Sequence, residues 1–271
     1  MVFGRKDGKS VISMRAKKIS LGLKLFASNI HLYKNARYLL DQGFFEYIEL
    51  YTPPGSEEFL TTWADNQTLY VIHGPHMVSG VNWADHALRK DNRAALTVAQ
   101  RYADTLHAPH IIIHGGFMGP IEEVAKQIDT VILAGESRLL LENTPKHGIN
   151  REISTIHLPS HINYIQNYVG VNKLGFVLDI GHAIYTANSF GYEHMFFLQQ
   201  FNMLSPKIYH LSDGDRKSLV DVHKNIGEGD FNLTEILNFI PVNAQVTVET
   251  PKNLAMGLKD ARVDAERLLA L

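Results

Sequence analysis

Carboxylate and imidazole side chains stand two or three residues apart at two places in this chain, each time after an apolar run. Residues 221–230 read Asp-Val-His-Lys-Asn-Ile-Gly-Glu-Gly-Asp, and residues 177–182 read Val-Leu-Asp-Ile-Gly-His. Divalent metal ions bind such sets of oxygen and nitrogen ligands, and neutral imidazole is the commonest nitrogen ligand in proteins. The two segments therefore indicate metal-dependent chemistry.

Residues of the same kind close five further runs rich in Val, Ile and Leu. Together with the two segments they give nine candidate metal ligands: His73, His114, Glu142, Asp179, His182, His210, Asp221, His223 and Glu249. A single polar residue at a strand end is more often a hydrogen-bonded cap than a ligand. Nine of them are better explained by a metal site, because carboxylates gathered so closely repel one another unless cations neutralise them.

The elements that must position these residues alternate regularly. Short apolar runs lie at 19–25, 47–51, 69–73, 110–114, 139–142, 175–179, 207–211 and 245–249, and helical patterns are clearest at 91–106, 121–133, 191–204 and 254–271. Apolar strands separated by helices are typical of parallel strands buried on both faces. Eight such units predict an α/β fold, a single-domain (β/α)8 barrel over residues 19–271, whose active site lies at the carboxyl ends of the strands. An open, doubly wound sheet is the alternative, but no Gly-x-Gly-x-x-Gly follows the first run.

Composition narrows the class of protein. The 271 residues include no cysteine, which excludes disulfides, thiolate zinc sites and a cysteine nucleophile, and fits a cytoplasmic location. The formal net charge of −2 gives no overall attraction for polyanions. No apolar run approaches the roughly 20 residues that a membrane helix needs, so we expect no membrane association. Residues 1–18 are basic and are predicted to be a flexible lead-in.

The order of these residues resembles endonuclease IV, an apurinic/apyrimidinic endonuclease (AP endonuclease family 2) of the xylose isomerase-like TIM barrel superfamily. The resemblance covers most of the chain after residue 68, and its most specific part is Asp-x-His-x-Asn-Ile-Gly-Glu-Gly from Asp221. It implies hydrolysis of the phosphodiester at abasic sites in DNA through a metal-bridging hydroxide.

The resemblance also implies a centre of up to three metal ions, usually zinc, with manganese as the alternative. His73 and His114 would hold one ion, and Glu142 would bridge it to a second. Asp179, His210 and Glu249 would complete the second ion. His182, Asp221 and His223 would hold a third. Glu142 and Glu249 would be the catalytic carboxylates, because they orient the hydroxide.

The chain departs from the endonuclease pattern where that family grips DNA. The first run reads Ile-Ser-Leu-Gly-Leu-Lys-Leu in place of a Gly-Ala/Ser-His-Val-Ser opening. The loop after residue 51 contains Glu57 and Glu58 but no basic residue. His76 and Met77 replace an aromatic residue and a leucine, and His76 becomes a candidate substrate contact. Phosphate contacts dominate nucleic-acid affinity, so an acidic loop would weaken binding.

A metal-dependent sugar or sugar-phosphate isomerase or epimerase of the same superfamily is the alternative function. It would need one ion, held by Glu142, Asp179, His210 and Glu249. Glu142 and Glu249 would then act as an acid/base pair, and Arg216 would contact substrate hydroxyls. This alternative gives no role to four of the candidates: His73, His114, Asp221 and His223. The expected partner is therefore DNA with abasic sites or a small sugar or phosphorylated substrate, with no obligatory protein partner evident.

Overall fold

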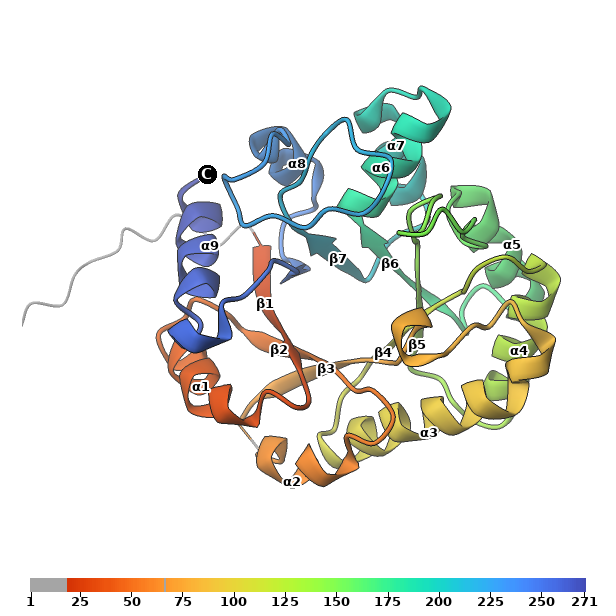
Figure 1. Ribbon diagram of the computed structural model, residues 1–271, viewed down its shortest axis with the longest axis horizontal. Coiled ribbons are helices and arrows are strands. Elements are labelled where there is room, and N and C mark those ends of the chain that lie inside the picture. The colour runs from red at the N-terminus through yellow and green to blue at the C-terminus, as the bar shows by residue number, and fades with distance from the viewer. Residues whose placement is uncertain (1–18, 66) are drawn as a thin grey trace, which may run out of the picture.

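Eight parallel strands form a closed barrel in the computed structural model, which describes residues 19–65 and 67–271. Each strand pairs with the next in the chain, and the last pairs with the first (Figure 1). The strands are β1 Ile19–Phe26, β2 Tyr47–Tyr51, β3 Leu69–His73, β4 Ile111–His114, β5 Leu139–Glu142, β6 Gly175–Asp179, β7 Ile208–Leu211 and β8 Ala244–Val248. The predicted (β/α)8 barrel is confirmed. The predicted basic lead-in, residues 1–18, lies outside the described residues.

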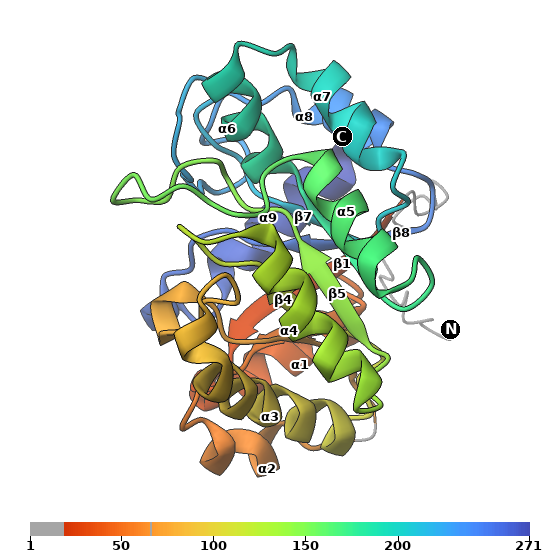
Figure 2. The same ribbon diagram turned by 90° about the vertical axis from the view of Figure 1, so that its right-hand side faces the viewer.

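Helices surround the barrel on its outer side (Figures 1 and 2). They are α1 Tyr33–Asp41, α2 Leu60–Trp63, α3 Arg89–Thr105, α4 Ile121–Leu133, α5 Pro159–Val169, α6 Ile180–Phe190, α7 His194–Asn202, α8 Leu233–Phe239 and α9 Lys259–Ala270. Short 3-10 turns occupy Ile30–Leu32, Glu57–Phe59, Met77–Ser79, His86–Leu88 and Leu254–Met256. No helix in the described part of the chain is long and apolar enough to cross a bilayer.

Two helical predictions were wrong at their amino-terminal ends. Gly191 does not begin a helix but ends α6 in the left-handed conformation, and α7 begins three residues later, where the Glu193 carboxylate accepts two backbone N–H groups. Similarly, Gly257 interrupts the helix predicted over 254–271, because its φ of 63° is left-handed. The α9 helix therefore begins at Lys259.

The barrel interior is built in layers. An apolar cluster of buried residues, one from each of β2 to β7, fills the interior: Tyr47, Val71, Ile112, Leu140, Val177 and Ile208. Tyr47 also closes the space at β1 and β8, because its ring covers Gly22 and its hydroxyl lies 2.9 Å from the Thr247 hydroxyl. Side chains alternate along a strand, so the residue two positions later points into the barrel one layer nearer the carboxyl end. Every one of the predicted strand-end ligands of β3 to β8 lies in that next layer.

Candidate metal centre

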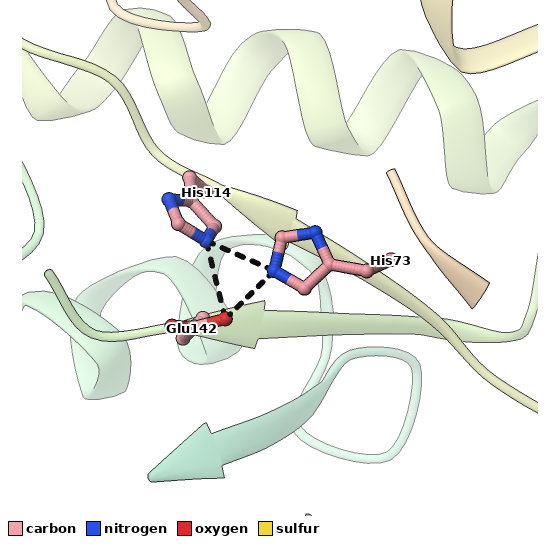
Figure 3. A group of neighbouring side chains, drawn as sticks. All are labelled: His73, His114 and Glu142. Carbon is pink, nitrogen blue, oxygen red and sulfur yellow. Dashed lines mark hydrogen bonds and ion pairs between the residues drawn. The ribbon is translucent and has the colours of Figure 1, made fainter. Parts of the chain in front are cut away.

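The first ligand group joins β3, β4 and β5. Nε2 of His73 lies 3.2 Å from Oε2 of Glu142, and Nε2 of His114 lies 3.1 Å from the same oxygen. The two imidazole nitrogens are 3.2 Å apart, so three potential donor atoms face one point (Figure 3). Tetrahedral zinc with ligands at 2.0–2.1 Å places neighbouring donors about 3.3 Å apart. The three side chains therefore already have the spacing of a metal-binding face.

The second group surrounds His210 on β7. Its Nδ1 lies 3.0 Å from Oε2 of Glu249 and 3.4 Å from Oε2 of Glu142, while Asp179 contributes an oxygen 4.0 Å away. His210 Nδ1 and Glu249 Oε2 are both buried, and neither has a hydrogen-bond partner among the described residues. Buried polar atoms without partners are costly, and a cation between them would satisfy both.

The third group lies where β6 meets the loop after β7. Nε2 of His223 is 2.9 Å from Oδ2 of Asp221, and Nε2 of His182 is 3.5 Å from the same oxygen. An oxygen of Asp179 also lies within 4.8 Å of the two imidazoles. The other oxygen of Asp221 is buried and has no hydrogen-bond partner within the described ranges. All nine predicted ligands thus gather at one end of the barrel, and Glu142 joins the first two groups.

Hydrogen bonds on the far side of the rings fix which nitrogen faces each group. Nδ1 of His73 lies 2.9 Å from the Gly74 carbonyl oxygen. In the same way, Nδ1 of His182 lies 2.8 Å from the Asn143 carbonyl oxygen. Nδ1 of His223 lies 2.6 Å from the Glu249 carbonyl oxygen. Since an N–H must donate to a carbonyl, Nδ1 carries the proton of the neutral ring, and Nε2 is the nitrogen whose lone pair faces the group when a metal ion replaces the second proton.

The charge of the site favours cations. Burial lowers the pKa values of His182 and His210, but neighbouring carboxylates outweigh it and raise both well above the usual value. The same balance, with Asp221 as the main partner, raises the pKa of His223 to about 9. Burial, with Glu142 and Glu249 nearby, raises the pKa of Asp179 to about 6. Protons on imidazoles compensate the carboxylates here, and divalent ions could take their place because the donors are oxygen and nitrogen atoms.

A buried aspartate shapes the loop that carries the third group. The Asp213 carboxylate accepts backbone N–H bonds of 2.8–3.2 Å from Gly214, Gly227, Gly229 and Phe231. Gly229 is required there, because a Cβ would overlap the carbonyl oxygen of Gly214. These contacts explain why the Gly-Glu-Gly segment follows the two ligands: it folds the loop back so that Asp221 and His223 face β6 and β8.

Two charged residues of the centre were missed by the sequence analysis. Lys24 on β1 donates to Oε1 of Glu49 on β2 at 2.6 Å and lies 3.2 Å from Oε1 of Glu249. The other oxygen of Glu49 accepts from Nε2 of His210 at 2.9 Å, which leaves Nδ1 of that ring facing the second group. Glu49 is completely buried. Their signal in the sequence was a charge in the middle of an apolar run.

The two predicted substrate contacts have different surroundings. The His76 ring stacks on His114 with centroids 4.6 Å apart, and it lines a cavity that also contains Glu249. Arg216 is exposed in the loop after β7 and lines a separate hollow with His194. The structure therefore brings His76 to the metal centre but does not bring Arg216 there.

Comparisons with known proteins place the fold. The sequence matches the family model described as xylose isomerase-like TIM barrel over residues 39–268. No curated protein matches the chain in sequence. A D-tagatose 3-epimerase-like protein has a TM-score of 0.69 at 20% identity, covering 92% of this chain and 97% of its own.

Two structures from Thermus thermophilus are also similar. Endonuclease IV has a TM-score of 0.64 at 19% identity, covering 93% of this chain and 100% of its own. A protein soaked with ZnCl2 has a TM-score of 0.66 at 19% identity, covering 91% and 98%. At these identities the likeness shows the fold alone, and both an endonuclease and an epimerase-like protein share it.

Proposed function

This chain belongs to the xylose isomerase-like TIM barrel family, and from that premise we propose that it is a metal-dependent phosphoester hydrolase. Abasic-site DNA is the first substrate to test, because the ligand order resembles that of endonuclease IV. The observation that supports the proposal is the presence of ligand groups beyond the one around His210. His73 and His114 aim two nitrogens at Glu142, and His182, Asp221 and His223 form a further triad. A single-ion isomerase would need no metal ligand at four of these positions: His73, His114, Asp221 and His223.

Zinc or manganese ions bound in these groups would polarise a phosphoryl oxygen and lower the pKa of a bound water. The protein's own residues would hold and orient. Glu142 is shared by two groups, with Oε2 toward His73, His114 and His210. Glu249 would be held by Lys24 through one oxygen, which turns the other toward His210. His76 lines the adjoining cavity, where it could contact the substrate.

The test is to remove the third group. Asp221→Ala combined with His223→Ala should lower the metal content by about one ion per chain and cut phosphodiester cleavage at least about 100-fold, since loss of even supporting residues costs 10–100-fold. Ions are counted by plasma mass spectrometry, and cleavage is followed on an abasic duplex. The matched control is His86→Ala with Asp91→Ala, two exposed residues outside the centre. Full turnover by the first variant would remove the third ion from the mechanism, and activity that resists a chelator would overturn the metal assignment itself.

A sugar epimerase is the second candidate, and the placement of Glu142 and Glu249 beside a small cavity favours it. Glu142 and Glu249 have ligand oxygens within 4.8 Å of each other, and Glu249 lines a cavity of about 340 Å³, within the usual size range for small-molecule sites. A proton transferred between these carboxylates and a sugar carbon would exchange with solvent. Purified protein with one ion per chain that exchanges a sugar C–H for deuterium in D2O, without cleaving phosphoesters, would establish this function instead.

A further inference from the structure

A cavity of about 340 Å³ opens beside the metal centre, between the segments that follow β1 and β8. Glu249 and His223 form its inner wall, so a molecule in the cavity would touch two candidate metal ligands. Lys24 and Lys252 line the same cavity. The centre is therefore continuous with a small chamber that carries two ammonium groups.

The two lysines have unequal partners. Lys24 has Glu49 at 2.6 Å and Glu249 at 3.2 Å. Lys252 donates to the Thr250 carbonyl oxygen at 2.8 Å, and among the described residues no carboxylate lies within ion-pair distance of it. An ammonium has three donors, so Lys252 retains two. When a cation engages the other oxygen of Glu249, the charge of that carboxylate is shared between Lys24 and the cation, and the chamber has an excess of positive charge.

Part of the chamber's lining is apolar. Phe26 and Leu254 line it although their side chains are 50% and 41% exposed. Tyr51 lies against Phe26 with ring centroids 5.1 Å apart, at an edge-to-face angle. Exposed apolar groups at the mouth of a polar site are suited to the face of a sugar ring, while the lysines are suited to an anion.

We propose that this chamber binds a phosphoryl group that is carried on a sugar-sized body and is distinct from the group facing the metal centre, with Lys252 and Lys24 as its donors. The inference rests on the proposed function, because it takes the metal centre as the place of reaction. Ammonium groups are common phosphate donors in proteins. The sugar phosphate can come from a nucleic-acid strand or from a free metabolite.

The test compares ribose 5-phosphate with ribose by isothermal titration calorimetry on the full-length protein as purified, and abasic duplex DNA by fluorescence anisotropy. Lys252→Gln removes the cation whose only described partner is a carbonyl. Lys259→Gln is the matched control, because Lys259 is exposed and does not line the chamber. Loss of one charged hydrogen bond should weaken binding about tenfold or more.

We expect the wild-type protein to bind ribose 5-phosphate more tightly than ribose. Lys252→Gln should reduce this affinity ratio about tenfold, whereas Lys259→Gln should leave it unchanged. A loss of affinity for the duplex alone would support the proposal and identify a nucleic-acid strand as the ligand that carries the phosphoryl group. A loss of affinity for ribose 5-phosphate alone would support the proposal and identify a free sugar phosphate as that ligand. Unchanged affinities of Lys252→Gln for both probes would overturn the proposal. Because binding is measured, a protein that binds through Lys252 but cleaves no phosphoester would refute only the proposed function.

Discussion

Replacing Glu49 with glutamine tests whether the buried carboxylate on β2 supports the metal centre. Glu49 accepts from Lys24 at 2.6 Å, from His210 at 2.9 Å and from the Thr247 hydroxyl at 2.6 Å. Burial raises the pKa of this carboxyl, but His210 and Lys24 outweigh it and lower the pKa to about 2. The group is therefore charged at neutral pH, and glutamine removes that charge while keeping the shape.

The structure sets the size of the effect. An amide has one acceptor oxygen for the three donors, so at least one of them loses its partner. Removing one member of a buried ion pair costs about 3–5 kcal/mol. Glu249 still lies 3.2 Å from Lys24 and retains part of the pairing, so we expect the free energy of unfolding to fall by about 2–3 kcal/mol. His210 also loses the acceptor that orients it, which should weaken zinc binding about 10–100-fold.

Urea unfolding of the chelator-treated protein gives the stability change, and competition with a chromophoric chelator gives the zinc affinity. Glu58→Gln is the control, because Glu58 is exposed in the loop after β2. Lys24→Met combined with Glu49→Gln should cost less than the sum of the two single changes, since both charges are then gone. A fall below about 0.5 kcal/mol, within the range of ordinary surface changes, with unchanged zinc affinity would refute the role given to Glu49.

Two further predictions concern the supports of the fold. Gly229→Ala should lower the free energy of unfolding by about 1–3 kcal/mol and reduce the zinc content, because the new Cβ would displace the carbonyl of Gly214 and with it the ligand loop. Urea unfolding measures the change in stability, and metal analysis measures the zinc content. Burial raises the pKa of Glu136, but hydrogen bonds from Arg138 outweigh it and lower the pKa from 4.5 to about 2. The stability this carboxylate contributes is therefore complete above pH 4.5 and is lost as the pH falls toward 2. The stability difference between wild type and Glu136→Gln should shrink over that range in acid titrations, and a constant difference would contradict the assignment.

The strands were predictable because the apolar runs are short and regularly spaced, and the clustering of the nine candidate ligands was predictable because most of them close such a run. The β2, β3, β5 and β6 strands have the predicted bounds, β1, β4 and β7 differ by one residue at one end, and β8 begins and ends one residue earlier than predicted. Helix α6 was not predicted, since every residue from Ile180 to Ala187 is buried and the segment has no polar face for a helical period to show. The Asp179 side chain caps this helix directly at the strand end, without an intervening loop. The place of the Arg216 side chain was not predictable either, because loop conformation depends on contacts such as those of Asp213.

Lys24 and Glu49 were not predicted because ligand-type residues were expected at strand ends, whereas the barrel is organised in layers. The apolar cluster of β2 to β7, with Gly22 on β1 and Thr247 on β8, forms one inward-facing layer. Two positions after each residue of this layer, the chain has a charged or imidazole side chain: Lys24, Glu49, His73, His114, Glu142, Asp179, His210 and Glu249. β1 and β2 continue past this layer, so their two members lie inside an apolar run. A search at a spacing of two from the apolar layer would have found both.

The composition of this ring explains why the metal groups lie on one side of the barrel. Its four carboxylates and one lysine leave a formal charge of −3 when the three histidines are neutral. Lys24 supplies a fixed positive charge at β1, where it neutralises Glu49 and faces Glu249, so a further cation there would be repelled. The remaining negative charge is carried by β5, β6 and β8, next to the imidazoles of β3, β4 and β7. Under the proposed function, this charge distribution would direct metal ions to the β3–β8 side, and the β1 side, with its lysine and its cavity, would be left for a substrate.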